Sequence, residues 1–266
     1  MLPVYVINLD RRPDRWKVMS EQLDRLGIEA TRIPAVDARL LAAQEEWESE
    51  TNGNPPFWRI NLGAAAGMLG HSKAMIDLIG STAPAALILE DDAELAPDTP
   101  TLLESVDWWP AGAHIVRLYG GYPNQRRTLW LPSGETPSGR SLCRLERWNN
   151  GAVAYLVNRA GARIALKAFA DPDHTVDHTL FDLQYSKTAR RLHTVQTVPA
   201  AAKHLDYDES DQQRWRERLE TEYQGGKRRR YRLRRNIEAI PYKMRVLALR
   251  AMGKVRKRLV PYSEAP

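Results

Sequence analysis

The chain has a single cysteine and no apolar run of about 18 residues. Cys143 has no partner for an internal disulfide, which fits a reducing compartment. The missing apolar run makes a membrane-spanning helix unexpected. Met1–Leu9 also lacks the basic lead-in and the small-residue cleavage site of a secretory signal. We therefore expect a cytoplasmic protein.

Several nucleotide and metal signatures are missing as well. The glycines between Gly63 and Gly70 are not followed by the Lys-Ser/Thr pair of a P-loop, and the turn after the first apolar run has no dinucleotide fingerprint. Cysteine and histidine do not occur at zinc-site spacing, and no Gly-x-Ser-x-Gly elbow is present. These absences disfavour a nicotinamide or flavin enzyme, a structural zinc site and serine-type hydrolysis.

Positive charge is concentrated near the C-terminus. The whole chain has a formal net charge of +6. From Lys227 onward it contains 14 lysines and arginines against two acids, Glu238 and Glu264, so this segment carries +12 and the remainder −6. A partner attracted by the basic segment need not be the substrate of the mildly acidic body. We predict one large domain over residues 1–223 and a basic tail over 224–266.

Apolar runs rich in β-branched residues alternate with helical patterns, which predicts an α/β fold. Val4–Leu9 predicts a central strand, Pro13 the first turn of a helix, and Gly27 its end. Further strands are expected at 31–36, 87–89, 114–118, 151–157 and 195–198, helices at 65–79, 159–169 and 179–188, and a hairpin at 128–147. The polar stretch 39–61 indicates a long surface loop near the substrate.

Three consecutive carboxylates, Glu90, Asp91 and Asp92, follow a buried apolar run. Strand ends are where α/β sheets bind their ligands. Neighbouring carboxylates repel one another unless a cation relieves them, and Mg²⁺ or Mn²⁺ takes carboxylate oxygens and substrate phosphates. The pattern thus indicates a metal site, with a solvated acidic turn as the alternative.

The turn after the first strand is a second candidate site. Arg11 and Arg15 suit a phosphate, the helix that follows adds anion affinity at its N-terminus, and Asn8 and Leu9 belong to the same turn. A solvated capping turn is the alternative. His71, in the glycine-rich helix, either faces a ligand or packs against the sheet.

Two further candidates lie far along the chain. Asp177 precedes a helix and is expected to meet the acidic cluster across the strand ends, where it would act as a general base toward an acceptor hydroxyl. A helix N-cap is its alternative role. His204 is a candidate imidazole ligand for the metal, although a single histidine is more often structural.

The basic tail mixes apolar residues with lysine and arginine at helical spacing over residues 242–252. This pattern is typical of an interfacial helix on an anionic membrane, and residues 227–258 are the expected membrane-binding segment. Residues 227–235 alone also suit nucleic acid. The interleaved apolar residues favour the membrane over nucleic acid, and a solvated tail without a partner is the remaining alternative.

Ordered sequence blocks resemble glycosyltransferase family 25, which includes lipooligosaccharide β-galactosyltransferases and collagen galactosyltransferases. The blocks are VYVINLDRRPDRW, GMLGHSKA, LILEDDAEL, GAVAYLVNRAGARIAL, VDHTLFD and ESD, and they span roughly residues 2–212. Where the family often has Cys and Leu-Ser near the glycine helix, this chain has Met68-Leu69-Gly70. The basic tail lies outside the blocks, which leaves the acceptor open.

The resemblance implies a GT-A-like α/β fold with a mixed, mostly parallel sheet flanked by helices. It also implies inverting transfer of a hexose, usually galactose, from a UDP-sugar to a lipid-linked glycan such as lipopolysaccharide. The enzyme would then lie on the inner face of the cytoplasmic membrane. A sugar nucleotidyltransferase is disfavoured because its glycine- and lysine-rich nucleotide loop is missing, and a basic-tailed nucleic-acid-binding protein is a third possibility.

Further residue roles follow from the same resemblance. Asp92 matches the main ligand of Mn²⁺ or Mg²⁺, and Glu90 and Asp91 would orient the ribose or the metal ligands, while His204 stays the candidate second ligand by its own chemistry. The turn from Asn8 to Arg15 would hold the nucleotide, together with His71. Asp177 would be the base, because inversion requires one carboxylate behind the acceptor hydroxyl.

Overall fold

The computed structural model describes residues 1–38, 62–120, 126–147, 151–170, 175–205, 236–237 and 239–265. The strands are β1 (Val4–Asn8), β2 (Thr31–Pro34), β3 (Ala85–Glu90), β4 (Ala93–Leu95), β5 (Ile115–Arg117), β6 (Arg127–Glu135), β7 (Ser141–Leu145), β8 (Ala154–Asn158), β9 (Thr194–Val198), β10 (Ala202–His204) and β11 (Val255–Arg258). The helices are α1 (Pro13–Leu26), α4 (Leu62–Gly80), α5 (Thr99–Leu102), α6 (Arg159–Phe169), α7 (Val176–Phe181), α8 (Lys187–Arg191) and α11 (Ile240–Ala251). The predicted loop at 39–61 lies outside the described residues.

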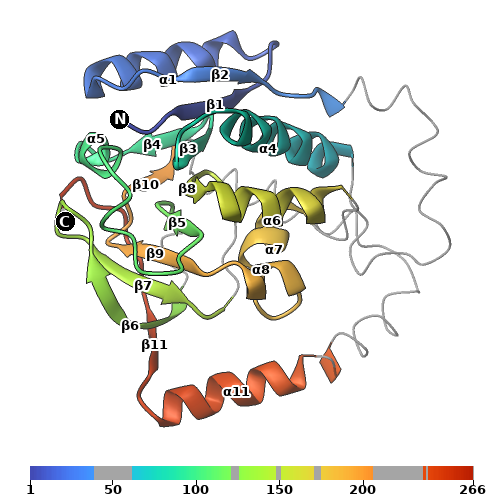
Figure 1. Cartoon of the computed structure of the whole chain (residues 1–266), viewed down its shortest axis with the longest axis vertical. Coiled ribbons are helices and arrows are strands. Elements are labelled where there is room, and N and C mark those ends of the chain that lie inside the picture. Colours follow the sequence, from blue (N-terminus) through green and yellow to red (C-terminus); the bar gives the residue numbers. More distant parts are fainter. Residues whose placement is uncertain are drawn as a thin grey trace, which may run out of the picture.

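The main sheet has the strand order β11-β6-β7-β9-β5-β8-β3-β1-β2, and β4 pairs with β10 in a small second sheet (Figure 1). The predicted mixed α/β sheet flanked by helices is confirmed. Antiparallel pairings nevertheless outnumber the parallel ones that we expected to prevail, since only β1–β2, β1–β3 and β5–β9 are parallel among the described strands. The reason is that β8 runs antiparallel between β3 and β5, and that the β6–β7 hairpin and β11 extend the other half.

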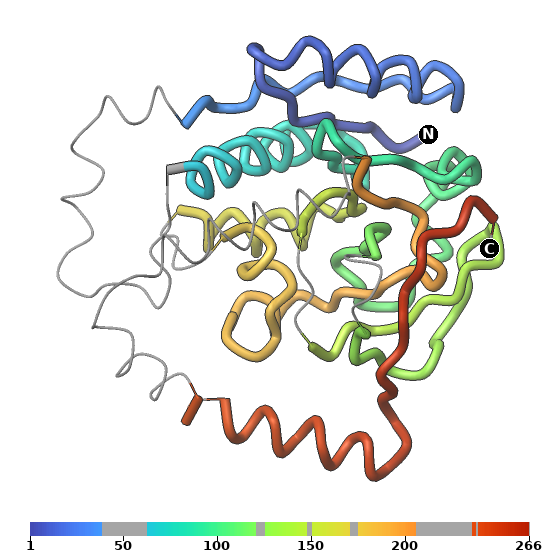
Figure 2. The backbone as a smooth tube through the Cα atoms, turned by 180° about the vertical axis from the view of Figure 1, so that it is seen from behind, coloured from blue at the N-terminus to red at the C-terminus, as the bar shows by residue number. Residues whose placement is uncertain are grey.

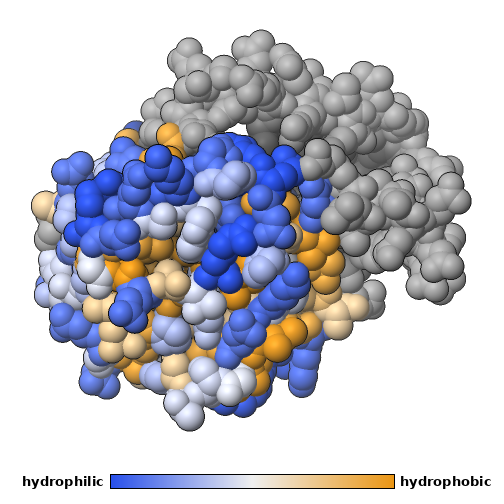
Figure 3. All heavy atoms as spheres, turned by 90° about the horizontal axis from the view of Figure 1, so that it is seen from above, coloured by the Kyte–Doolittle hydropathy of each residue, from blue (hydrophilic) through white to orange (hydrophobic). Residues whose placement is uncertain are grey.

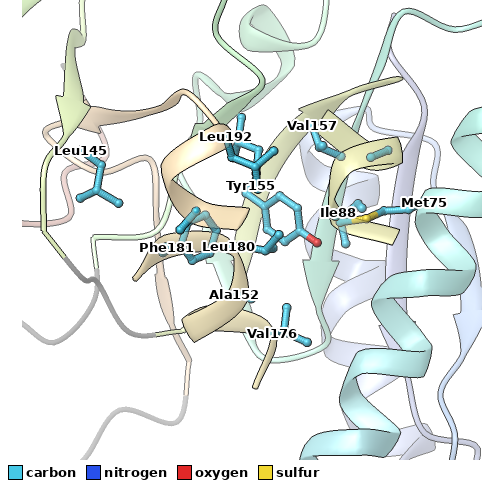
Figure 4. Close-up of a cluster of buried hydrophobic side chains, with 14 of the residues drawn as sticks. Met75, Ile88, Leu145, Ala152, Tyr155, Val157, Val176, Leu180, Phe181 and Leu192 are labelled. Atoms are coloured by element: carbon cyan, nitrogen blue, oxygen red, sulfur yellow. The ribbon is translucent and has the colours of Figure 1, made fainter. Parts of the chain in front are cut away.

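Both faces of the central strands β1, β3 and β8 are buried, which explains their continuous apolar runs. Along β1, Tyr5 and Ile7 enter the core beneath α4, α6 and α7, whereas Val4 and Val6 enter the core beneath α1 and α5. Figure 2 shows these helices on the two sides of the sheet. In Figure 4, Tyr155 of β8 lies among side chains of β3 and α7 in the first of these cores.

Helix α1 begins and ends where the sequence predicts. Pro13 occupies its first turn, and Gly27 ends it in the left-handed region with φ of 65°. Met19 and Leu23 pack on the sheet, and the opposite face is polar. Viewed from this end, the molecule is largely hydrophilic, with hydrophobic side chains visible between the polar ones (Figure 3).

The predicted helix at 179–188 is wrong, because two short helices, α7 and α8, replace it. Between them, Oδ1 of Asp182 accepts hydrogen bonds from the backbone N–H groups of Gln184 and Tyr185, at 3.0 and 3.2 Å. Ser186 then caps α8 by accepting from the N–H of Ala189. Side-chain bonds to nearby backbone compete with helix propagation, and here they turn the chain.

The expected helical tail is confirmed only in part. Helix α11 is present, but Val255–Arg258 forms an edge strand that pairs antiparallel with β6. The chain then returns to the body, where Ala200 pairs with Tyr262. The predicted boundary between residues 223 and 224 lies outside the described residues. No helix within the described ranges is long and apolar enough to cross a membrane.

Arg140 connects the end of the chain to the body. It is fully buried, and its guanidinium donates two hydrogen bonds to Asp98, at 2.7 and 2.6 Å. It also donates to the carbonyl oxygens of Ala200 and Ser263, at 3.0 and 2.9 Å. One side chain thus joins the β6–β7 turn, the start of α5, the segment after β9 and the C-terminal segment.

This ion pair predicts a specific acid sensitivity. Burial alone would raise the pKa of Asp98, but hydrogen bonds from Arg140 and Ser138 and the arginine charge lower it below its usual value. A carboxyl whose pKa is lowered by folding stabilises the protein above its unfolded pKa of about 3.9 and loses that contribution as the pH falls through the lowered value. We expect Asp98→Asn to reduce the dependence of unfolding free energy on pH between about pH 5 and 2. Urea unfolding at several pH values measures this dependence, and Asp24→Asn, at an exposed position, is the control. If the unfolding free energy of Asp98→Asn changes with pH as much as that of Asp24→Asn, the prediction is contradicted.

Candidate active site

A cleft of about 300 Å³ opens where β1 and β3 end and α1 begins. The two strands are adjacent and parallel, with Ile7 opposite Glu90, so their carboxyl ends meet at one edge of the sheet. The cleft is lined by Ile7, Leu9, Arg11, Arg12, Arg15, Ala35, Glu90, Asp91 and Asp92. The two sites predicted separately from the sequence therefore form one site.

Arg15 supplies the positive charge that the acidic cluster requires. Its Nη1 lies 3.1 Å from Oδ1 of Asp91 and 2.8 Å from Oδ2 of Asp92. The charges of both carboxylates raise the pKa of Arg15 even though burial alone would lower it. The arginine thus relieves the repulsion that the sequence implies, from a helix whose N-terminus faces the same cleft.

The side chain of Asn8 forms hydrogen bonds with the turn, with Asp91 and with Arg32, and these use its donors and its acceptor. Its side chain is 1% exposed, and its Nδ2 donates to Asp91 Oδ2 at 2.7 Å and to the carbonyl of Arg12 at 3.0 Å. Its Oδ1 accepts from Nε of Arg32 at 2.8 Å. We therefore assign the side chain of Asn8 to fixing the turn and Asp91, rather than to direct contact with a nucleotide.

His204 and Asp92, the two proposed metal ligands, lie side by side. The pairing of β10 with β4 brings His204 opposite Ala93, and its Nε2 lies 3.1 Å from Oδ2 of Asp92. Burial alone would raise the pKa of Asp92, but the hydrogen bonds and charges of His204 and Arg15 lower it, so the carboxyl is ionised at neutral pH. Its second oxygen, Oδ1, is buried and has no hydrogen-bond partner among the described residues.

These donors fit a hard divalent cation that also binds substrate oxygens. The orphaned carboxylate oxygen of Asp92 suits Mn²⁺ or Mg²⁺, and the His204 imidazole beside it is a second donor, a nitrogen, at the same place. Within the described ranges, no group of three or more His, Cys, Asp or Glu side chains is placed to hold a metal. The remaining positions would therefore belong to phosphate oxygens and water, as is usual for Mg²⁺ in nucleotide sites.

Glu90 is oriented by a buried pair that the sequence did not reveal. Nε2 of His71 lies 3.4 Å from Oε1 of Glu90, and its Nδ1 is 2.8 Å from the hydroxyl of Tyr155. Burial, and to a lesser degree the Glu90 charge, raises the pKa of Tyr155 well above its usual value, so the hydroxyl keeps its proton. The two ring nitrogens of His71 thus face two different partners, the Tyr155 hydroxyl and the Glu90 carboxylate. His71 thus positions Glu90 from behind.

Asp177 lies at the same edge of the sheet but does not line the cleft. Its Oδ2 accepts from the N–H of Gly151 at 3.1 Å, and Gly151 is two residues before Val153, whose carbonyl pairs with the N–H of Glu90. Oδ1 accepts from Thr175 and from the N–H of His178. Burial alone would raise the pKa of Asp177, but His178, Thr175 and Gly151 lower it strongly. Thr175 is the N-cap of α7, so Asp177 is a partly buried, ionised carboxylate in the first turn and not the cap itself.

Arg117 is the charged neighbour of this region that sequence reasoning missed. It is fully buried, donates to the carbonyl of Gly151 at 2.8 Å and stacks on Tyr119 and Phe181. Burial, and then the Arg127 charge, lowers its pKa to about 9, so it stays protonated at neutral pH. Gly151 has φ of 79°, and a Cβ there would come within 2.6 Å of Tyr119. The sequence feature that could have indicated a buried charge is that β5 is otherwise apolar and ends in a single arginine.

Arg11 and Arg12 complete the basic rim of the cleft. Nε of Arg11 pairs with Oδ2 of Asp37 at 2.9 Å, and Arg12 pairs with Asp14 at 2.7 Å. Both arginine side chains are partly exposed, at 46% and 36%, so they remain accessible to a ligand. Arg12 was not among the predicted nucleotide contacts, although it belongs to the same turn.

The family of the chain follows from sequence comparison. A sequence model described as "Glycosyltransferase family 25 (LPS biosynthesis protein)" matches residues 1–180. The chain therefore belongs to glycosyltransferase family 25, as its ordered blocks predict. This membership supports glycosyl transfer as the class of chemistry.

Relatives match over a shorter stretch. Proteins named "Glycosyltransferase 25 family member" are 31% identical in Drosophila melanogaster and 29% identical in Aedes aegypti, each over 100 residues. Each alignment covers 35% of this chain and 16% of the relative, so the match spans far less than two thirds of the relatives' length.

Two solved structures are similar in outline. One is a glycosyltransferase involved in the glycosylation of the major capsid of PBCV-1, with a TM-score of 0.41, 8% identity, and coverage of 82% of this chain and 99% of that chain. The other is the mannose-1-phosphate geranyltransferase from Thermus thermophilus, with a TM-score of 0.36, 13% identity, and coverage of 75% and 74%. At these TM-scores neither structure supports an argument about this chain.

Proposed function

We propose that this chain is an inverting glycosyltransferase that moves a hexose, galactose in the first instance, from a UDP-sugar to a lipid-linked glycan. One observation carries the proposal. Arg11, Arg12, Arg15 and Asp92 line one cleft at the carboxyl ends of β1 and β3, beside the N-terminus of α1, and His204 pairs with Asp92. A diphosphate needs such cations, and family membership supplies the class of reaction.

Asp92 and His204 are the residues that would hold Mn²⁺ or Mg²⁺. When bound, the cation would neutralise charge on the UDP leaving group. Arg11 and Arg12 would bind the diphosphate from the rim, and Arg15 would keep Asp91 and Asp92 in place. Asn8 would fix the turn that presents these arginines.

Asp177 is proposed as the base that accepts the proton of the acceptor hydroxyl. Its carboxylate is ionised, as a base requires, but its hydrogen bonds with Thr175 and Gly151 reduce its basicity. Glu90, which lines the cleft and is 35% exposed, is the matched comparison. If Glu90→Gln abolishes transfer with donor binding intact while Asp177→Asn does not, the assignment of the base to Asp177 is wrong.

The proposed reaction is tested by measuring UDP release from a panel of UDP-sugars, with lipid-linked glycan acceptors, in the presence of Mn²⁺, Mg²⁺ or excess chelator. We expect release that depends on both metal and acceptor, with UDP-galactose the best donor. Full activity in excess chelator would contradict the metal proposal, because Arg15 would then be a sufficient cation. Absence of release from every UDP-sugar, with pyrophosphate formed from a nucleoside triphosphate and a sugar phosphate, would favour a nucleotidyltransferase instead.

A membrane partner is also part of the proposal. Residues 227–258 would hold the enzyme at the inner face of the cytoplasmic membrane, where a lipid-linked acceptor is found. Nucleic acid is the less favoured partner, and binding to it would weaken steeply with salt.

A further inference from the structure

Helix α11 is apolar on two opposite faces. The inner face buries Tyr242, Val246 and Leu249 against the body. On the outer face, Ile240, Met244 and Leu247 are 51%, 60% and 55% exposed. Spacings of four and three residues place these three side chains on one side of the helix, opposite the buried set. Ile237, which is 56% exposed, lies before the start of α11 and is not counted in this stripe.

The outer stripe is turned away from the sheet. Figures 1 and 2 show α11 along the rim of the molecule, beyond β6 and β7, with the body on one side only. Scattered exposed apolar residues are normal on soluble proteins, but three large ones aligned on a single helix face are not. This surface therefore requires a partner with an apolar phase.

The charges around the stripe identify that partner. From Ala239 to Ser263 the chain has seven basic residues and no acidic one. Lys243 of α11 is exposed, and Lys254, Arg256 and Lys257 follow the helix at exposed positions, whereas Arg245 pairs with the buried Glu146 of the body at 3.0 Å. An apolar helix face bordered by cations matches a surface with anionic headgroups over hydrocarbon.

We propose that the outer face of α11 docks on an anionic lipid bilayer, with Ile240, Met244 and Leu247 entering the interface. The inference rests on the membrane part of the proposed function and names the surface that performs it. A second copy of the chain is the less suitable occupant, because self-association through α11 would bring the exposed cations Lys243, Lys254, Arg256 and Lys257 close to those of the second copy.

The position of α11 leaves the cleft accessible. The helix lies beside β11 and β6, at one edge of the main sheet, whereas β1 and β3 lie near the opposite edge. A bilayer in contact with α11 therefore does not cover the ends of β1 and β3. This geometry also permits the two functions to be tested separately.

The test uses the full chain with vesicles of phosphatidylcholine, with or without about 30% phosphatidylglycerol. We expect co-sedimentation with the anionic vesicles only, and an affinity lowered at least about tenfold in Met244→Glu/Leu247→Glu, since two large side chains no longer enter the interface. Ile76→Glu is the matched control, because Ile76 is 57% exposed on α4, and it should bind like the unaltered chain. Charge reversal at Lys243 and Lys254 should also weaken binding and reduce its salt dependence.

The proposal is overturned if Met244→Glu/Leu247→Glu binds the vesicles as tightly as the unaltered chain, or if the unaltered chain does not bind them. It is also overturned if the unaltered chain is a dimer that dissociates in the double variant, because a second copy would then occupy the stripe. Thermal unfolding verifies that both variants are folded. UDP release toward a water-soluble acceptor is measured in parallel. If the unaltered chain binds the vesicles but releases no UDP, the catalytic proposal alone is refuted.

Discussion

Replacing Asp92 by asparagine is expected to lower kcat/KM for sugar transfer by about 10²–10³-fold, the loss typical of one preorganised group that stabilises transition-state charge. The carboxylate combines burial, contacts with Arg15 and His204, and one oxygen without a hydrogen-bond partner among the described residues. An amide keeps the shape but removes the negative charge that a cation needs. The loss should therefore appear in catalysis and in metal dependence rather than in the fold.

The measurement is UDP release across a Mn²⁺ titration. Asp92→Asn should require far more metal or fail to respond to it, while Asp24→Asn, the same change at an exposed position of α1, should behave as the unaltered chain. A variant at Asp92 with normal kcat/KM and an unchanged metal optimum would show that this carboxylate is structural.

Replacing Arg140 by methionine is expected to lower the free energy of unfolding by about 3–5 kcal/mol, the cost of breaking a buried ion pair by removing one partner. Asp98 would remain mostly buried without its cation, with 15% of its side chain exposed. The carbonyls of Ala200 and Ser263 would lose their donor as well. Both losses weaken the attachment of the C-terminal segment.

Urea unfolding measures this change. Adding Asp98→Asn should recover part of the loss, because the uncompensated charge is then removed. Arg163→Met, at an exposed arginine of α6, is the matched control and should stay within about 0.5 kcal/mol of the unaltered chain. A change of that small size at Arg140 would mean that the buried pair contributes little.

The sequence predicted the elements whose causes are local. Pro13 and Gly27 set the ends of α1, and apolar runs marked β1, β3 and β8, because each signal lies within a few residues of the structure it produces. β11 was missed for the opposite reason. Three of its four residues are basic, and its strand conformation depends on pairing with β6, which no local pattern reveals.

For the candidate site, too, some contacts could be predicted from the sequence and others depend on distant packing. The strand-end rule anticipated that the β1 turn and the acidic cluster would meet, and ligand chemistry singled out His204 as a companion for Asp92. The contact of His71 with Tyr155 and the burial of Arg117 depend on how helices pack on the sheet. The separation of Asp177 from the cleft lining depends on the path of the loop before β8, which spacing along the chain does not determine.

The pairing of β11 with β6 bears on the order in which the protein is made. Trp130 and Val255 are neighbours in the sheet, yet more than a hundred residues of chain separate them. During synthesis the outer edge of β6 is complete long before its partner strand leaves the ribosome, and an unpaired edge is where chains associate wrongly. Any nascent or clipped chain that lacks β11 therefore exposes β6 as the edge of the sheet, in place of a strand in which three of four residues are basic and disfavour the addition of another strand.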